Sequence, residues 1–322
     1  MAYKLQLKEK KILHELDLDA RKSNIQIAKK LRLSKNVVNY QINKLEEQEI
    51  IKGYHSLFDF SKLGLSLFRV YFDFYEFDQE KENQLIEFLI DSKITGFVAK
   101  TVGNWDLVVS FYVKSDDEFL DHWFKILKQF RDVIKEYNTN LIVKEFFFRR
   151  AYLTTESKDK SNSIWVRGGN EKVEIDDKDR EIIRFLTKDS RIPLTKISQG
   201  IGLGSMGTIY RLKNLAKTNV LIGSRADLNF AKLGYEYYKV VLQLEEINAF
   251  KSIFSYCQMH PNITSVTKTI SSNVDMEFDL EIEDFNMFIE LIDQLKKMFP
   301  KAVRDYKYLK FINFKKTAYL PL

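Results

Sequence analysis

The chain has 322 residues and a formal net charge of +6, with 45% hydrophobic and 14% aromatic side chains. This composition supports packed cores and excludes a wholly disordered chain, and the length predicts two to four domains. The one cysteine, Cys257, excludes a disulfide framework and a cysteine-rich zinc site. No apolar stretch reaches the roughly 18 residues of a membrane span, and the N-terminus lacks a signal-peptide core, so we expect a cytoplasmic protein.

The first sixty residues follow a helix-turn-helix pattern. Apolar residues at helical spacing predict helices at 7–18, 25–31 and 34–48. Ser34 occupies the N-cap position of the third helix, since its hydroxyl can accept a backbone N–H of the first turn. Residues 50–54 are typical of a short strand leading into a turn. A helix, a turn, a second helix and then a strand pair form the layout of a winged helix-turn-helix, in which the second of these helices enters the DNA major groove. Here that helix is the one predicted at 34–48.

The next segment alternates between strand and helix patterns in the order strand, helix, strand, strand, helix, strand. This order predicts a βαββαβ ferredoxin-like domain. The expected elements are strands at 67–75, 96–102, 107–113 and 141–152, and helices at 80–92 and 116–130. The polar stretch 155–172 carries Gly168-Gly169 and has no helical or strand period, so we interpret it as a linker.

The whole pattern returns after a shift of 170 residues. Residues 12–64 align with 182–234 without a gap, and the matched residues include Asp19 with Asp189, Arg21 with Arg191, Tyr40 with Tyr210, and Gly53 with Gly223. The chain is therefore an internal duplication. Helices are expected at 179–186, 194–201, 205–215, 248–259 and 285–299, and strands at 236–244, 263–270, 276–282 and 305–314.

These elements predict an α+β chain of two winged helix-turn-helix domains, each followed by a βαββαβ domain. The predicted boundaries are 1–64 and 65–154 for the first copy, 155–172 for the linker, and 173–234 and 235–322 for the second copy.

Positive charge concentrates in the helix-turn-helix segments. Residues 1–62 hold 13 Lys and Arg against 8 Asp and Glu, and residues 172–232 hold 12 against 7, so each segment is +5 and the remainder is −4 (6 − 5 − 5). This distribution is typical of a protein that binds nucleic acid.

The chain resembles the leucine-responsive/asparagine-synthesis regulator (Lrp/AsnC) family of bacterial and archaeal transcription factors, present twice. The resemblance covers nearly the whole chain and rests on Asp19-Ala20-Arg21, Leu33-Ser34, residues 42–46, residues 50–54, Leu63-Gly64 and Gly103-Asn104-Trp105-Asp106. In that family the βαββαβ (RAM-type) domain mediates dimerisation and can bind small effectors, often amino acids. Members typically carry one copy and pair as homodimers. The resemblance therefore implies a regulator of transcription that binds double-stranded DNA as an intrachain pseudo-dimer and could assemble further into a homo-oligomer.

The third helix of the first module has one apolar and one polar face. Val38, Ile42 and Leu45 form the apolar stripe, which leaves the other side for DNA. Asparagine can pair with adenine, and lysine can donate to guanine or phosphate. The predicted DNA-contacting residues are Ser34, Lys35, Asn36, Asn39, Tyr40 and Asn43, with Lys52 touching phosphates. An ordinary solvated helix face is the alternative interpretation.

In the second module, Met206 and Ile209 stand where the first has Asn36 and Asn39. They can touch thymine methyls but offer no hydrogen bonds to base edges. The predicted contacts here are Ser205, Tyr210, Arg211, Lys213 and Lys217. Our hypothesis is that the first module supplies sequence specificity and that the second adds weaker, phosphate-dominated contacts.

The turn Gly103-Asn104-Trp105-Asp106 is the candidate effector site. Gly103 can adopt positive φ or let a ligand approach the backbone, and Asn104 and Asp106 offer polar groups. In the second copy the glycine is replaced by Ser272, which argues against effector binding there. A tight turn without a ligand is the alternative interpretation.

Enzyme chemistry is not predicted. The four histidines show no metal-ligand spacing, and no phosphate-binding glycine loop is present, so we expect no metal and no cofactor. Two alternatives stay open. Siroheme decarboxylases share this two-part architecture and use a basic or imidazole-lined cavity for tetrapyrrole carboxylates; the basic residues available here are Arg69, Lys100, Arg149 and Arg150. The winged helices could also dock proteins instead of DNA.

Overall fold

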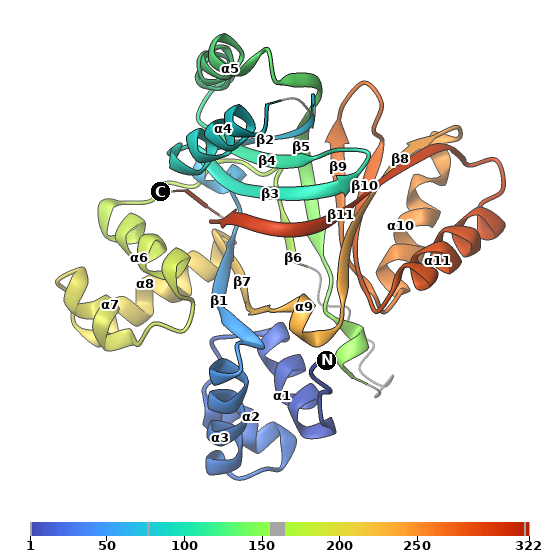
Figure 1. The fold of residues 1–322 in the computed structure, drawn as a ribbon. Coiled ribbons are helices and arrows are strands. Elements are labelled where there is room, and N and C mark those ends of the chain that lie inside the picture. The colour runs from blue at the N-terminus through green and yellow to red at the C-terminus, as the bar shows by residue number, and fades with distance from the viewer. Residues whose placement is uncertain (1, 76–77, 155–164, 319, 322) are drawn as a thin grey trace.

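The computed structural model describes residues 2–75, 78–154, 165–318 and 320–321. The chain forms two copies of one unit, each a three-helix module, a strand and a βαββαβ domain (Figure 1). The first copy contains α1 (Leu7–Leu18), α2 (Asn24–Leu31), α3 (Lys35–Glu47), β1 (Ile51–Phe58), β2 (Ser66–Phe74), α4 (Gln79–Asp91), β3 (Thr95–Gly103), β4 (Leu107–Val113), α5 (Asp116–Phe130) and β5 (Ile134–Phe147). The predicted α+β fold class and both βαββαβ domains are confirmed.

The second copy repeats this order after the short strand β6 (Trp165–Arg167). It contains α6 (Asp177–Lys188), α7 (Leu194–Gly200), α8 (Ser205–Lys217), β7 (Leu221–Leu228), α9 (Phe230–Leu233), β8 (Glu236–Leu244), α10 (Phe250–Met259), β9 (Ile263–Ile270), β10 (Met276–Ile282), α11 (Phe285–Met298) and β11 (Val303–Thr317). β6 lies in the stretch interpreted as a linker, where its backbone pairs with the end of β5. Residues 155–164 of that stretch lie outside the described residues.

The two βαββαβ sheets join at both edges and close into one barrel. Within the copies, β2 pairs with β4 and β5, and β8 pairs with β10 and β11. The long strands β5 and β11 cross between the copies, because the second half of β5 pairs with β9 and the second half of β11 pairs with β3. Eight of the nine strands of this described sheet therefore form a ring, β2-β4-β3-β11-β8-β10-β9-β5. A closed ring leaves none of these strands as a free sheet edge.

Successive side chains of each barrel strand point alternately toward the covering helices and toward the barrel interior. On β10, Met276, Phe278 and Leu280 pack in the core beneath α10 and α11. Glu277, Asp279 and Glu281 alternate with them and point into the barrel, since successive side chains of a strand lie on opposite faces. The first copy follows the same rule, with α4 and α5 over its outer face (Figure 1). The barrel interior is therefore built partly from charged side chains.

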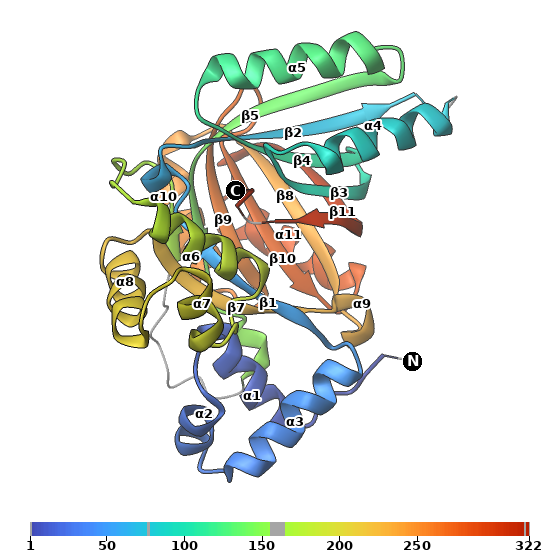
Figure 2. The ribbon, with the colours of Figure 1, turned by 90° about the vertical axis from the view of Figure 1, so that its left-hand side faces the viewer.

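The wing strands of the two modules pair with each other. β1 and β7 form an antiparallel two-stranded ribbon with Ser56 opposite Ser224. Figure 2 shows this ribbon below the barrel, with α1, α2 and α3 beneath it and α6, α7 and α8 to its left. The strand pair expected within each winged module is thus formed between copies. The cores are shared as well, because Ala226 and Leu228 of β7 pack against the first module's helices, and Phe58 of β1 packs against the second module's helices.

Candidate nucleic-acid interface

The recognition helices α3 and α8 begin differently. Ser34 is the N-cap of α3, and its Oγ accepts a hydrogen bond from the backbone N–H of Val37 at 3.2 Å. The equivalent residue of α8 is Gly204, which has no side chain to cap the helix. The predicted cap at Ser34 is confirmed, and α8 lacks the stabilisation that such a cap provides.

The first module exposes most of the residues predicted to contact DNA. Val38, Ile42 and Leu45 are buried against α1 and α2, which turns the opposite face of α3 outward. Tyr40 is 66% exposed. Asn39 is half-buried, and its Oδ1 accepts a hydrogen bond from the Asn24 side chain at 2.7 Å. The remaining exposed residues on this face are Ser34, Lys35, Asn36 and Asn43.

The second module exposes a more apolar face. Met206 is 79% exposed and Tyr210 is 73% exposed. Ser205, Lys213 and Lys217 are exposed beside them. Both faces carry an exposed tyrosine, and they differ in that the exposed Asn36 and Asn43 of the first module are replaced by Met206 and Lys213 in the second.

Two residues that were predicted to contact DNA form ion pairs within the protein instead. The Lys52 ammonium lies 3.3 Å from the Asp227 carboxylate and 5.7 Å from the centre of the Phe314 ring, on the barrel side of the ribbon. The Arg211 guanidinium pairs with Asp176 and Asp179 at the start of α6, at 2.8 Å and 2.9 Å. Both cations thus bind partners within the protein, which the spacing along the chain could not reveal.

The helical modules contact each other directly. Arg191 Nη1 donates to the backbone carbonyl of Ala20 at 2.6 Å, and Arg21 Nη1 donates to the carbonyl of Ser190. The Ala20 and Ser190 N–H groups also donate to the opposite wing strands, at Ser224 and Tyr54. With the ribbon, these contacts fix the positions of α3 and α8 relative to each other.

A buried ion network ties the first module to the barrel. Asp17 of α1 accepts hydrogen bonds from Arg150 at 2.7 Å and from Arg225 at 2.6 Å. Arg150 also donates to Glu281 of β10 at 2.8 Å. Burial acts to raise the pKa of Asp17, but the guanidinium groups of Arg225 and Arg150 outweigh it and lower that pKa. Thr187 occupies the equivalent position in the second module, so this network exists on one side.

The barrel interior holds a second network of paired charges. Arg69 of β2 donates to Glu145 of β5 at 2.6 Å and to Glu277 of β10 at 2.5 Å. Lys239, the counterpart of Arg69 in the second copy, lies 2.6 Å from Asp279. Burial acts to raise the pKa of Glu145, yet Arg167 and Arg69 lower it to about 2. The interior cations are therefore matched by carboxylates.

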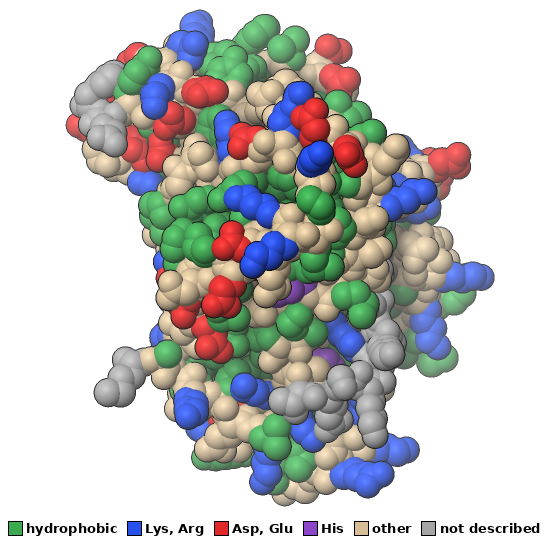
Figure 3. Space-filling model, turned by 90° about the vertical axis from the view of Figure 1, so that its right-hand side faces the viewer, with side chains coloured by type: hydrophobic (Ala, Val, Ile, Leu, Met, Phe, Trp, Pro, Cys, Tyr) green, Lys and Arg blue, Asp and Glu red, His purple; other side chains and the backbone are tan. Residues whose placement is uncertain are grey.

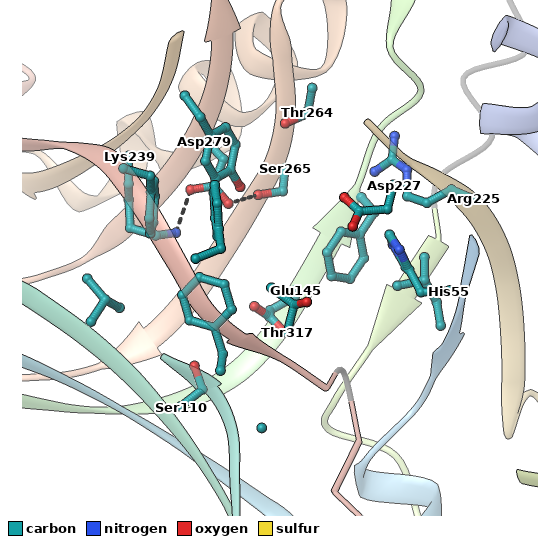
Figure 4. Close-up of a pocket in the computed structure, with 18 of the residues that line it drawn as sticks. His55, Ser110, Glu145, Arg225, Asp227, Lys239, Thr264, Ser265, Asp279 and Thr317 are labelled. Atoms are coloured by element: carbon teal, nitrogen blue, oxygen red, sulfur yellow. Dashed lines mark hydrogen bonds and ion pairs between the residues drawn. The ribbon is translucent and has the colours of Figure 1, made fainter. Parts of the chain in front are cut away.

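A cavity of about 120 Å³ lies where the ribbon meets the open end of the barrel. Figure 4 shows Arg225, Asp227 and His55 of the ribbon facing Lys239, Asp279 and Ser265 of the barrel. Burial, followed by the charges of Arg225 and Arg150, lowers the pKa of His55 well below its usual value. Sequence reasoning did not identify this cavity, because its walls come from distant segments.

The predicted effector turn is occupied by its own hydrogen bonds. Gly103 has φ +124°, and the Asn104 amide oxygen accepts from the backbone N–H of Tyr308 at 2.9 Å. The Asp106 carboxylate accepts from the N–H of Phe74 at 2.9 Å, and Asp275 makes the equivalent contact with Leu244 in the second copy. These bonds join β3 and β4 to their neighbours. The geometry therefore agrees with the alternative interpretation, a structural turn.

Of the four basic residues named for a tetrapyrrole site, Arg69 and Arg150 line the same cavity, and each is paired there with carboxylates. Lys100 does not line it and pairs with Glu82 at 2.7 Å. Arg149 Nε and Nη1 are buried without a hydrogen bond among the described residues. Within the described ranges, no cluster of three or more His, Cys, Asp or Glu side chains is arranged to hold a metal, and none of the helices could cross a membrane.

The distribution of charge on the surface agrees with the count of charged residues along the sequence, which placed the positive charge in the helix-turn-helix segments. In the view of Figure 3, Lys and Arg side chains gather at the lower end, over the first helical module, and acidic side chains are frequent toward the top. The basic end is the one that carries α3.

A family model described as winged helix-turn-helix DNA-binding matches residues 5–52 and 175–222, once in each copy. An uncharacterized HTH-type transcriptional regulator of Pyrococcus horikoshii is 39% identical over 144 residues, which cover 41% of this chain and 83% of that protein. The HTH-type transcriptional regulator FL11 of Pyrococcus furiosus is 27% identical over 125 residues, covering 38% of this chain and 82% of that protein. The regulatory protein AsnC of Haemophilus influenzae is 30% identical over 89 residues, or 23% and 59% of the two chains.

Among solved structures, a siroheme decarboxylase superimposes with a TM-score of 0.66 at 13% identity, covering 97% of this chain and 93% of that chain. At this identity the likeness shows the two-copy fold alone. The sequence relatives carry the assignment of family, since one of them is 39% identical and is matched over most of its length. The chain belongs to the Lrp/AsnC family of HTH-type transcriptional regulators, with two family units joined in one chain.

Proposed function

We propose that this protein is a transcriptional regulator that binds double-stranded DNA in a sequence-specific manner as an intrachain pseudo-dimer. The observation that carries the proposal is the pair of exposed recognition-helix faces held by one rigid connection. The reciprocal contacts of Arg21 and Arg191 and the β1–β7 ribbon support a fixed separation of α3 and α8. Half-sites about one helical turn apart, or a multiple of it, are expected for such a pair.

The two faces support recognition of an asymmetric operator. A homodimer presents the same helix twice and reads a palindrome. Here Asn36 and Asn43 of α3 would read base edges, and Lys35 would donate to guanine or phosphate. On α8, Met206 and Tyr210 would make apolar contacts, while Ser205, Lys213 and Lys217 contact phosphates. Lys52 and Arg211 are left out of the proposed interface because of their partners within the protein.

Selection of duplexes from a random pool by the purified full-length chain tests this function. We expect enrichment of one asymmetric motif, with the stronger base preference in one half. The full chain is required because the helical modules share their cores. A pool that shows no enriched motif at any salt concentration contradicts specific recognition. An enriched palindrome contradicts the proposed division of roles between α3 and α8.

An enzyme related to siroheme decarboxylases is the second candidate, favoured by the full-length likeness in fold. Two observations argue against it. The cavity of about 120 Å³ is below the ~300–1,000 Å³ of pockets that bind drug-sized ligands. Its cations Arg69 and Lys239 are already paired with carboxylates, whereas a tetrapyrrole carboxylate needs unpaired ones. Titration with siroheme, followed by absorbance, distinguishes the two functions: tight binding without DNA binding would favour the enzyme.

The proposal also includes the location of the protein, its regulation by an effector and its assembly. We expect the protein to act in the cytoplasm of a bacterium or archaeon, where it can reach the chromosome. Regulation by a small effector would follow the family pattern, although Asn104 Oδ1 and Asp106 Oδ2 of the turn at Gly103 already accept backbone hydrogen bonds. Assembly of pseudo-dimeric chains into a homo-oligomer can be measured by sedimentation.

A further inference from the structure

An arginine of the second module is hydrogen-bonded to the recognition helix of the first module through two side-chain amides. Arg191 Nη2 donates to Asn24 Oδ1 at 2.7 Å, and Asn24 Nδ2 donates to Asn39 Oδ1 at 2.7 Å. Asn24 is the first residue of α2. Asn39 lies on α3, three residues after Asn36 and four before Asn43. Residues at this spacing share one face of a helix, so Asn39 belongs to the face proposed to meet DNA.

Arg191 fixes the direction of this relay, because a guanidinium group has donors only. The Asn24 atom that faces Arg191 must be its oxygen, which turns the Asn24 nitrogen toward α3. The Asn39 atom that receives this nitrogen must in turn be an oxygen. Asn39 Nδ2 makes no hydrogen bond among the described residues, and it is not one of their buried unpaired atoms, so it is open to solvent.

The first copy holds Arg191 in place. Arg191 Nη1 donates to the backbone carbonyls of Ala20 at 2.6 Å and of Lys22 at 3.2 Å. Its guanidinium carbon lies 5.0 Å from the centre of the Tyr54 ring. These contacts restrict the rotamers of the side chain, so Nη2 keeps its position against Asn24.

The relay runs in one direction only. Arg21 occupies the position equivalent to Arg191 and donates to the Ser190 carbonyl. The residues equivalent to the two asparagines of the relay are Leu194 and Ile209, which carry no amide. Arg21 therefore has no such amide pair leading to α8, which makes it the matched control for Arg191.

We propose that Arg191 is a positioning residue for base recognition by the first module, because through Asn24 it holds Asn39 with only N–H donors toward the DNA. The recognition of a base rests on the proposed function; the orientation of the amide does not. In the major groove guanine presents two acceptors, N7 and O6, whereas adenine presents the N7 acceptor beside the N6 donor. A donor-only amide therefore favours guanine and cannot make the bidentate pair with adenine that a freely rotating asparagine makes. The second module thus takes part in reading the half-site of the first.

NMR of the side-chain amides of the free full-length protein tests the orientation. The Asn24 amide, which is bonded to Asn39, should exchange its hydrogens with water roughly threefold more slowly than the Asn39 amide. This difference should disappear in Arg191→Met and remain in Arg21→Met. Equal exchange in the unmodified protein, or slower exchange of the Asn39 amide, overturns the orientation.

Anisotropy measurements on the selected operator test the reading of DNA. Asn39→Ala identifies the base pair that Asn39 meets, as the position whose preference this variant loses. There the unmodified protein should bind guanine roughly fivefold more tightly than adenine. Arg191→Met should bring this ratio to within about twofold of one, and Arg21→Met should leave it unchanged. The proposal is overturned if Asn39→Ala keeps every base preference, if the unmodified protein prefers adenine, or if the two methionine variants act equally.

Asn24→Asp gives an independent test, because it keeps a partner for Arg191. The carboxylate can accept from Arg191 but has no N–H, so Asn39 must turn its nitrogen inward and present Oδ1 to the DNA. A carboxylate at the first position of α2 suits the helix dipole, and circular dichroism verifies the fold of each variant. We expect the guanine-to-adenine ratio to invert, since an acceptor now meets the N6 donor of adenine. An unchanged ratio overturns the relay.

The two kinds of measurement separate the possible failures. If no operator can be selected while the amides exchange as expected, the proposed function fails, and base reading fails with it, but the orientation of Asn39 stands. If an operator is selected and the ratio does not respond to Arg191→Met or Asn24→Asp, the proposed function stands and the positioning role of Arg191 is wrong.

Discussion

Arg21 and Arg191 each donate a hydrogen bond to the backbone carbonyl of the residue that precedes the other. Arg21 Nη1 reaches Ser190, and Arg191 Nη1 reaches Ala20 at 2.6 Å. The two arginines occupy equivalent positions, 170 residues apart, in the duplicated chain. This reciprocal contact is what a two-fold axis produces in a homodimer, and here it lies within one chain.

Arg191→Ala should loosen the contact between the helical modules. The change removes hydrogen bonds to Ala20, Lys22 and Asn24 and a cation–π contact with Tyr54. Because Arg191 is half-buried, we expect a loss of roughly 2 kcal/mol in the free energy of unfolding. Urea denaturation measures it. Arg184→Ala is the control, since that arginine is 51% exposed and pairs with Glu181 one turn away; its effect should stay within about 0.5 kcal/mol.

Asp17→Asn should be far more damaging than a change at its counterpart. The substitution leaves Arg150 and Arg225 buried with less compensating charge, which costs roughly 3–5 kcal/mol. Thr187→Ala changes the equivalent position of the second module, where the hydroxyl bonds within its own helix, and should cost under about 1 kcal/mol. Similar losses for both variants would show that the first module has no special tie to the barrel.

The stability of the barrel should fall in acid through Glu145. Its pKa is about 2 in the folded protein, against an ordinary value of 4.5. A carboxyl with a depressed pKa contributes its full stability above about pH 4.5 and loses it as the pH falls toward 2. The contribution is of the order of 3 kcal/mol.

Comparison with Glu145→Gln isolates this contribution. The difference in the free energy of unfolding between the unmodified protein and the variant should be largest at neutral pH. It should shrink between pH 4.5 and 2, as Glu145 of the unmodified protein becomes protonated in the unfolded state and then in the folded state. A difference that is constant over this range would contradict the assigned pairing with Arg69 and Arg167.

Gly204→Ser should stabilise the second module. Gly204 is the N-cap of α8, its φ is −68°, and no atom lies within 4 Å of an added Cβ. A serine there can accept a backbone N–H as Ser34 does in α3, and it also reduces the entropy of the unfolded chain. We expect a gain of about 0.5–1 kcal/mol. The reverse change, Ser34→Gly, should lower stability by a similar or smaller amount; thermal unfolding compares them.

Variants at Lys35 and Asn36 should distinguish a residue that contacts phosphate from a residue that recognises a base. Lys35→Gln should weaken binding to all duplexes alike and reduce the slope of log affinity against log salt by about 1. Asn36→Ala should leave the slope unchanged and cost about 1–3 kcal/mol on the preferred operator alone. Fluorescence anisotropy at several salt concentrations measures both. An unchanged preference in Asn36→Ala would remove that residue from the proposed reader.

The repeat and the local elements follow from the sequence by itself. The 170-residue shift, the apolar stripe at Val38, Ile42 and Leu45, and the cap at Ser34 are local signals, because helical spacing and capping act within one turn. The strand–helix order of each βαββαβ domain was predicted for the same reason. Strand ends were less well predicted: β5 begins at Ile134 rather than 141, since its early residues acquire strand geometry by pairing with β2.

Tertiary structure alone decided how the copies meet. The alternation of apolar and polar residues on β10 indicated a strand, and the polar face of such a strand normally points to water. In the structure that face points into a closed barrel, where Glu277 and Asp279 meet Arg69 and Lys239. No residue close in sequence to β10 indicated this arrangement. The same holds for Lys52, which lies beside an exposed recognition helix in sequence and pairs with Asp227 in space. Local propensity depends on neighbours within a few residues, whereas the barrel, the ribbon and the cavity are made by residues that are far apart along the chain.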